Sequence, residues 1–189
     1  VDGPLAAGAD VQGISATGYL SLLALLLRLG CLDADGHFRT PASPLARRVA
    51  PPPQQARTGL RLPLPYGQWL AAADVEELLK VKAAFSQALE ALLRAAGLAA
   101  ADVACLALAG ALGEHCPPAC LEELGFLPSG MGRRVRAVGN SSLDGAALLA
   151  AEPWRLPALA RWCAAATLVP VAEDPGFHAD YLRHMRFGV

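Results

Sequence analysis

The segment from Val11 to Leu29 constrains the fold most, because it predicts a helix that is apolar almost all round. Such a helix has no polar face to offer water, so other elements must enclose it. Its uncharged part contains glutamine, glycine, serine and threonine residues, unlike the roughly 20 predominantly apolar residues of a membrane span. We therefore expect a buried core helix, with Gly30 at its C-terminal cap and a turn at Asp35-Gly36.

A second helix, from Asp74 to about Ala96, has the clearest periodicity in the chain. Asp74 suits the N-cap position, and Glu77 three residues later completes a pair that resembles a capping box. Lys82 lies in the middle of the apolar face, where its ammonium group must reach solvent, pair or contact a ligand, because burying it unpaired is costly. That face consists of Val75, Leu78, Leu79, Val81, Phe85, Leu89, Leu92, Leu93 and Ala96.

Short strands are predicted at 103–109, 135–138 and 168–171, and helices alternate with them. The helices run from Ser141 or Ser142 to about 150, from 153 to about 166, and from 175 to 184. This alternation indicates an α/β layer architecture that is rich in helix.

The region between the first two helices is less regular. Residues 37–56 hold five prolines, which predicts a mostly irregular excursion. Residues 60–64 predict an edge strand, because Pro63 cannot sit in the centre of a ladder.

Glycines follow two of the predicted strands, in Ala109-Gly110-Ala111-Leu112-Gly113 and in Val138-Gly139-Asn140. In open α/β sheets ligands bind outside the carboxyl ends of the strands, where glycine lets a ligand approach the backbone. Ordinary turn geometry explains the same residues without a ligand. Neither the dinucleotide-binding nor the P-loop glycine signature occurs in the chain.

Composition argues against several classes of protein. The formal net charge is −1 and the basic residues are scattered, which disfavours binding to nucleic acid or to an anionic membrane. No basic segment precedes the apolar helix, so we expect no signal peptide. The five cysteines form an odd set without the spacing of a disulfide framework, as is typical of a reducing cytoplasm.

Metal binding and serine hydrolysis are also disfavoured. His115, Cys116 and Cys120 lie close in sequence, but no second pair has the spacing of a zinc site, and buried free cysteine is common. The sequence has no Gly-x-Ser-x-Gly elbow. We therefore predict no metal ligands and no catalytic residues in this chain.

Seven short motifs, taken in order, resemble the C-terminal region of the reductive activators of corrinoid proteins, which are ferredoxin-linked ATPases. The resemblance spans essentially the whole chain. The motifs are residues 11–20 (VQGISATGYL), 29–36 (LGCLDADG), 74–84 (DVEELLKVKAA), 108–113 (LAGALG), 125–128 (GFLP), 138–146 (VGNSSLDGA) and 174–177 (DPGF).

The resemblance implies an α/β fold, one lobe of an actin-like ATPase with an RNase H-like sheet flanked by helices. Residues 1–189 would form a single domain, a C-terminal fragment of a longer protein. ATP with Mg²⁺ would be shared with an N-terminal lobe of the same protein, which would carry the Asp-x-Gly-Thr phosphate loops that this chain lacks. A [2Fe–2S] cluster is expected only in that missing part, and a corrinoid protein is the implied partner.

The resemblance also implies residues that contact the nucleotide. Glu77 and Lys82 would contact the nucleoside, Gly110, Ala111 and Gly113 correspond to the adenosine motif, and Gly139, Asn140 and Gly145 correspond to the connecting motif at the hinge. Ala111 departs from the family, which prefers glycine there. Its methyl group would crowd a nucleoside and weaken binding.

Two other functions stay open at this point. A non-catalytic interaction module would retain the fold with a decayed nucleotide site, and a sugar or acetate kinase would need a catalytic aspartate in the other lobe. We expect this fragment alone to be inactive as an ATPase, because it lacks the loops and carboxylates that position Mg²⁺ and water. A homodimer is also compatible with the sequence.

Overall fold

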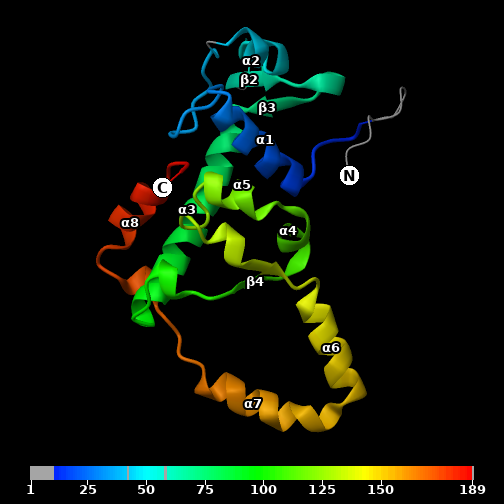
Figure 1. Ribbon diagram of the computed structural model, residues 1–189, viewed down its shortest axis with the longest axis vertical. Coiled ribbons are helices and arrows are strands. Elements are labelled where there is room, and N and C mark those ends of the chain that lie inside the picture. The colour runs from blue at the N-terminus through cyan, green and yellow to red at the C-terminus, as the bar shows by residue number, and fades with distance from the viewer. Residues whose placement is uncertain (1–10, 42, 58, 189) are drawn as a thin grey trace.

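The computed structural model describes residues 11–41, 43–57 and 59–188, and its longest element is the helix α3 (Ala72–Ala95). Two further helices, α1 (Ala16–Arg28) and α5 (Pro118–Glu123), pack against each other beside it (Figure 1). The core that these elements share is almost entirely apolar. Its most deeply buried members are Leu23, Ala24, Leu26, Cys31, Ala50, Leu62, Leu70, Val75, Ala83, Leu124 and Met131.

Helix α1 confirms the predicted core helix but begins later than Val11. Its N-cap is Ser15, whose Oγ accepts a 3.1 Å hydrogen bond from the Gly18 N–H. Gly30 follows the helix with a φ of 65°, which is the left-handed conformation expected at a C-terminal cap. In the described part of the chain, α1 and the other helices lack the combination of length and apolar character needed to cross a membrane.

The proline-rich region forms more regular structure than predicted. It contains the helix α2 (Pro44–Val49) and the strand β1 (Gln54–Ala56). Strands β1, β2 (Gly59–Pro63) and β3 (Trp69–Ala71) form an antiparallel sheet in the order β1-β2-β3. The edge-strand prediction for 60–64 was therefore wrong, since β2 is central. Pro63 is tolerated because it is the last residue of the strand.

A second sheet consists of two parallel strands, β4 (Leu106–Leu108) and β5 (Val135–Ala137). The chain between them forms α4 (Gly110–His115), α5 and a 3₁₀ turn, η3 (Gly132–Arg134). Arg134 connects this sheet to the segment before it. Its Nη1 donates to the carbonyl oxygens of Ala100, Ala101 and Val103 at 2.8, 3.0 and 3.1 Å.

After β5 the chain forms an arm that extends away from the core (Figure 1). The arm consists of α6 (Ser141–Ala151), the 3₁₀ turn η4 (Pro153–Arg155) and α7 (Leu156–Ala165). Asn140, rather than a serine, caps α6, because its Oδ1 accepts from the Leu143 N–H at 3.2 Å. The predicted strand at 168–171 does not form; a 3₁₀ turn, η5 (Val171–Glu173), begins there instead.

The chain returns to the core as α8 (Phe177–His184), which packs along α3. Lys82 of α3 is completely buried, with 0% of its surface exposed, and its Nζ donates to the carbonyl oxygens of His184 and Arg186 at 3.1 and 2.7 Å. Further along α3, Glu90 accepts from Arg183 Nη2 at 2.7 Å and lies 2.8 Å from His184 Nε2. Polar contacts from α3 therefore hold the C-terminal end of α8.

These contacts shift the ionisation of both α3 residues. Burial, reinforced by the nearby positive charge of Arg183, lowers the pKa of Lys82 from 10.5 to about 8. The hydrogen bond from Arg183 is the main cause that lowers the pKa of Glu90 to about 2, against the opposing effect of burial.

Helix α3 begins two residues before the predicted start. Asp74 is its third residue rather than its N-cap, and its carboxylate accepts from the Ala71 N–H at 2.9 Å. Glu77 is not part of this cap, because its carboxylate pairs with Lys80 Nζ at 2.8 Å.

We predict that Lys82→Met destabilises the protein by about 2 kcal/mol at neutral pH, because two buried carbonyl groups lose their donor. The deficit should grow as the pH rises from 8 to 10.5, since in that range the unfolded chain holds a proton that folded Lys82 has released. Urea unfolding at several pH values measures both effects. Lys80→Met, which removes a partly exposed lysine of the same helix, is the control; equal behaviour of the two variants would contradict the prediction.

We also predict that Gly113→Ala destabilises the fold by about 2 kcal/mol or more. A Cβ at this position would lie 2.6 Å from Leu108 Cβ and 2.7 Å from the Leu108 carbonyl oxygen, so α4 would have to move away from β4. Ala111→Gly changes an exposed position of the same helix and should cost no more than about 1 kcal/mol. Thermal unfolding that ranks the two variants in the opposite order would refute this packing role.

Candidate functional site

The two glycine-containing junctions predicted from the sequence meet at one edge of the parallel sheet. The Gly110 N–H donates to the Gly139 carbonyl oxygen at 2.7 Å, directly beyond the bond from the Val138 N–H to the Leu108 carbonyl at 3.0 Å. Gly110 and Gly139 have φ values of 82° and 63°, a conformation that side-chain-bearing residues rarely adopt. The structure thus brings Gly110, Ala111, Gly139 and Asn140 together outside the carboxyl ends of β4 and β5, where ligands bind in α/β sheets.

Within this edge the residues of α4 differ in what they contribute. Ala111, the second residue of the helix, is exposed. Gly113 is buried. The short distances from a Cβ at this position to Leu108, given above, show that α4 packs too closely on β4 for any larger residue. Solvent therefore reaches this edge of the sheet at Ala111 and, in part, at Gly110. Gly113 faces the interior and packs against β4.

Glu77 lies at a different place, in a cavity of about 390 Å³ between α1 and α3. Tyr19 and Asp74 also line this cavity and were not predicted. Asp74 precedes Glu77 by three residues, so the helical spacing would have placed both carboxylates on the same face. The complete lining is Ala16, Tyr19, Leu23, Asp74, Glu77, Leu78 and Val81.

Lys82 does not share that cavity with Glu77. Five residues separate them, which turns their side chains about 140° apart around the helix axis. Glu77 is exposed, whereas the Lys82 ammonium points to the carbonyl groups at the end of α8. Nucleoside binding by Lys82 stays a prediction, and its described contacts are those of a residue that stabilises the fold.

Gly145 lies on α6, one turn beyond the cap that Asn140 forms. A Cβ built at Gly145 would have nothing within 4 Å among the described residues. The close helix packing expected of the connecting motif would thus require an element outside those residues.

The cysteines near His115 are poor candidates for metal ligands. Cys116 and Cys120 are buried, while His115 is exposed. Burial, and secondarily Cys120, raises the pKa of the Cys116 thiol to about 11. A metal at Cys116 would therefore have to displace a proton that burial makes harder to remove.

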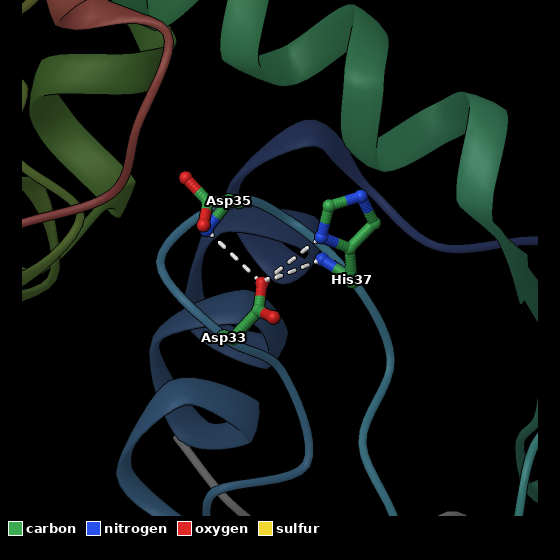
Figure 2. A group of neighbouring side chains, drawn as sticks. All are labelled: Asp33, Asp35 and His37. Atoms are coloured by element: carbon green, nitrogen blue, oxygen red, sulfur yellow. Dashed lines mark hydrogen bonds and ion pairs between the residues drawn. The ribbon is translucent and has the colours of Figure 1, made fainter.

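A second polar cluster, formed by Asp33, Asp35 and His37, stabilises the turn after α1 (Figure 2). Asp33 Oδ1 accepts from the N–H groups of Asp35 and His37 at 3.0 and 2.9 Å, and its Oδ2 lies 2.6 Å from Arg39 Nη2. Burial opposes ionisation of Asp33, but these hydrogen bonds prevail and lower its pKa. Asp35 in turn pairs with Arg186 Nε at 2.7 Å. The carboxylates thus neutralise arginines and connect the turn to the C-terminal segment.

Comparison with known proteins identifies the family. A family model described as the C-terminal domain of RACo, the ASKHA domain, matches residues 4–188. Among solved structures, a reductive activator for corrinoid, iron-sulfur protein superposes with a TM-score of 0.79 at 20% sequence identity. The match covers 96% of this chain and 29% of that one, so this chain spans less than a third of its length. None of the curated proteins matches.

The match and the geometry agree on the fold. A helix-rich α/β lobe is the architecture that the sequence predicted, and the family model extends over nearly all of it. The chain therefore belongs to the family of C-terminal ASKHA domains of RACo.

Proposed function

We propose that this chain is the adenosine-side lobe of an ATP-dependent reductive activator of corrinoid proteins. The observation that carries the proposal is the meeting of Gly110 and Gly139 at the carboxyl ends of two parallel strands. Both glycines lack side chains and are half-buried, which leaves room for a flat, mostly neutral nucleoside to approach the backbone. The resemblance of residues 108–113 and 138–146 to the adenosine and connecting motifs of the family supports nucleotide binding at this edge.

In this proposal Gly110, Ala111, Gly139 and Asn140 approach the nucleoside, and Glu77 contributes from the cavity beside α1. ATP would supply the free energy of phosphoryl transfer, with Mg²⁺ and the phosphates held by the N-terminal lobe. This chain contains no Asp-x-Gly-Thr loop, so its own part is to bind and orient the nucleoside. The lobe alone should not hydrolyse ATP.

In the intact protein, ATP binding and hydrolysis would change the relative position of the two lobes. That change would accompany electron transfer from a [2Fe–2S] cluster in the N-terminal part to a corrinoid protein, the partner we propose. The five cysteines, all free in the described structure, suit the reducing cytoplasm in which we place the protein.

A second candidate function is a non-catalytic interaction module that keeps the fold without the nucleotide. Two observations favour it. The Ala111 methyl group is exposed at the point where the family prefers glycine, and the Lys82 ammonium is bound to two carbonyl groups of the C-terminal segment. Nucleotide binding by the intact protein distinguishes the two functions.

We predict that ATP or ADP raises the melting temperature of the intact protein. Ligand at 100 times its dissociation constant should add about 2.7 kcal/mol of apparent stability. Ala111→Gly should bind more tightly, because removing the methyl group relieves crowding. Thermal unfolding measures the change in melting temperature, and isothermal titration calorimetry measures the nucleotide affinity of the two proteins.

Ala119→Gly is the matched control, because Ala119 is the exposed second residue of the equally short helix α5. It should leave the nucleotide affinity unchanged. If neither nucleotide stabilises the intact protein or its Ala111→Gly variant, the nucleotide-binding proposal fails and the interaction module becomes the better account.

A further inference from the structure

A cavity of about 450 Å³ lies between the C-terminal half of α3, the loop that follows α5 and the end of α8. Residues 125–128, the GFLP motif quoted above, form one of its walls. The described residues that line it include none from the two glycine junctions and none from the cavity that contains Glu77. It is therefore a second site, separate from the proposed nucleotide edge. Its apolar lining consists of Leu89, Leu93, Leu98, Phe126, Leu127 and Pro128.

The two permanently charged side chains in the lining, Glu90 and Arg94, already have partners. Arg94 donates to Asp174 Oδ2 at 3.2 Å and to Asp180 Oδ2 at 3.3 Å. Glu90 accepts from Arg183 at the distance given above. One carboxylate and one guanidinium group also cancel in charge. A molecule in this cavity would therefore find no unpaired charge to neutralise its own, so an uncharged molecule fits best.

The hydroxyl group of Ser86 in the lining is occupied as well, because it donates to the Gly125 carbonyl oxygen at 2.9 Å. His184 differs, although only 8% of its side chain is exposed. Its Nδ1 is buried and has no hydrogen-bond partner in the described part of the chain. A buried polar atom without a partner is destabilising, and a bound molecule would remove that cost by supplying a hydrogen bond.

The contact between His184 and Glu90 determines which kind of hydrogen bond is missing. The pKa of Glu90 is about 2, so its carboxylate is ionised and can only accept. His184 Nε2, 2.8 Å away, must therefore carry the hydrogen. In the neutral imidazole Nδ1 is then an acceptor, and the ligand must be a donor.

A donor can reach Nδ1 if the imidazole ring tilts toward the cavity. Rotation of a histidine ring about its Cβ–Cγ bond has a broad energy minimum, so a tilt costs little. The Glu90 side chain is partly exposed and can follow the ring. Leu98, which is exposed, lies on the side where a ligand enters.

We propose that this cavity binds an uncharged aromatic molecule of one or two rings with a single N–H or O–H group. The rings lie among the leucines and Phe126, and the N–H or O–H donates to His184 Nδ1. The volume agrees with this size, since about 150 Å³ holds a benzene ring and ligand pockets measure roughly 300–1,000 Å³.

The first test compares two ligands on the intact protein by isothermal titration calorimetry. Indole has the required N–H, whereas 1-methylindole has the same rings and no donor. Indole should bind at least about 10-fold more tightly, as expected for one hydrogen bond to a buried acceptor. Equal affinities, or no binding of indole up to its solubility limit, would overturn the proposal.

The second test fills the cavity. Leu93→Trp places a larger side chain at a half-buried lining position and should abolish indole binding. Leu92→Trp is the matched control, because Leu92 is the exposed neighbour on the same helix and does not line the cavity. It should bind indole as the unmodified protein does. Equal binding by the two variants would show that indole binds elsewhere, which contradicts the proposal.

His184→Phe tests the hydrogen bond directly, because phenylalanine keeps an aromatic ring and has no acceptor. The variant should bind indole and 1-methylindole equally, and a folded variant that still prefers indole would refute the role of Nδ1. If it does not fold, the comparison of ligands and the Leu93→Trp variant decide.

Nucleotide competition separates this site from the proposed function. ATP should not displace indole from the intact protein, and competitive displacement would overturn the assignment of a second site. Indole binding without ATP binding rejects only the proposed nucleotide function. ATP binding without indole binding rejects only the site described here.

Discussion

The buried ammonium group of Lys82 is the interaction on which the arrangement of the chain depends. It lies on the long central helix and binds carbonyl groups that are 102 and 104 residues further along the chain. Between these points the chain builds the parallel strands, leaves the core as the arm and comes back. The returning helix α8 packs along α3, and polar contacts from α3 to its C-terminal end add to the burial of Phe187 just beyond it.

Because the chain is attached in this way, the lobe has two parts that differ in how well their side chains are packed. The apolar core around α1, α3 and α5 is closed and well packed, and the glycine edge of β4 and β5 lies to one side of it. The arm is held at both ends, yet among the described residues none of its side chains is buried. The described structure thus contains one closely packed part and one part whose apolar side chains are exposed.

Much of the fold could be predicted from the sequence, because the spacing of apolar residues along the chain reflects which side chains are buried. The existence of α3, its extent to within about two residues, and the two strands with their glycine junctions could be predicted from the spacing of apolar residues and glycines. Lys82 was identifiable as a residue that needed a partner, but the partners are backbone carbonyl groups, which leave no pattern in a sequence. The antiparallel sheet was missed because three consecutive prolines precede it. Prolines indicate positions that do not suit the centre of a sheet, but they do not indicate where a strand begins. Gly113 had the signature of a ligand-facing glycine, yet its role is defined by contact with Leu108, which only the folded chain reveals.

The three carbonyl groups that Arg134 binds have a consequence for the nucleotide edge. Strands of three residues exchange too few hydrogen bonds to define their own alignment, and a slip by one residue would turn every side chain to the opposite face. Arg134 joins the beginning of β5 to the segment that leads into β4, and so sets how far each strand reaches. Arg134 therefore helps to place Gly110 opposite Gly139 from the other end of the strands, where a ligand at the glycine edge would not touch it.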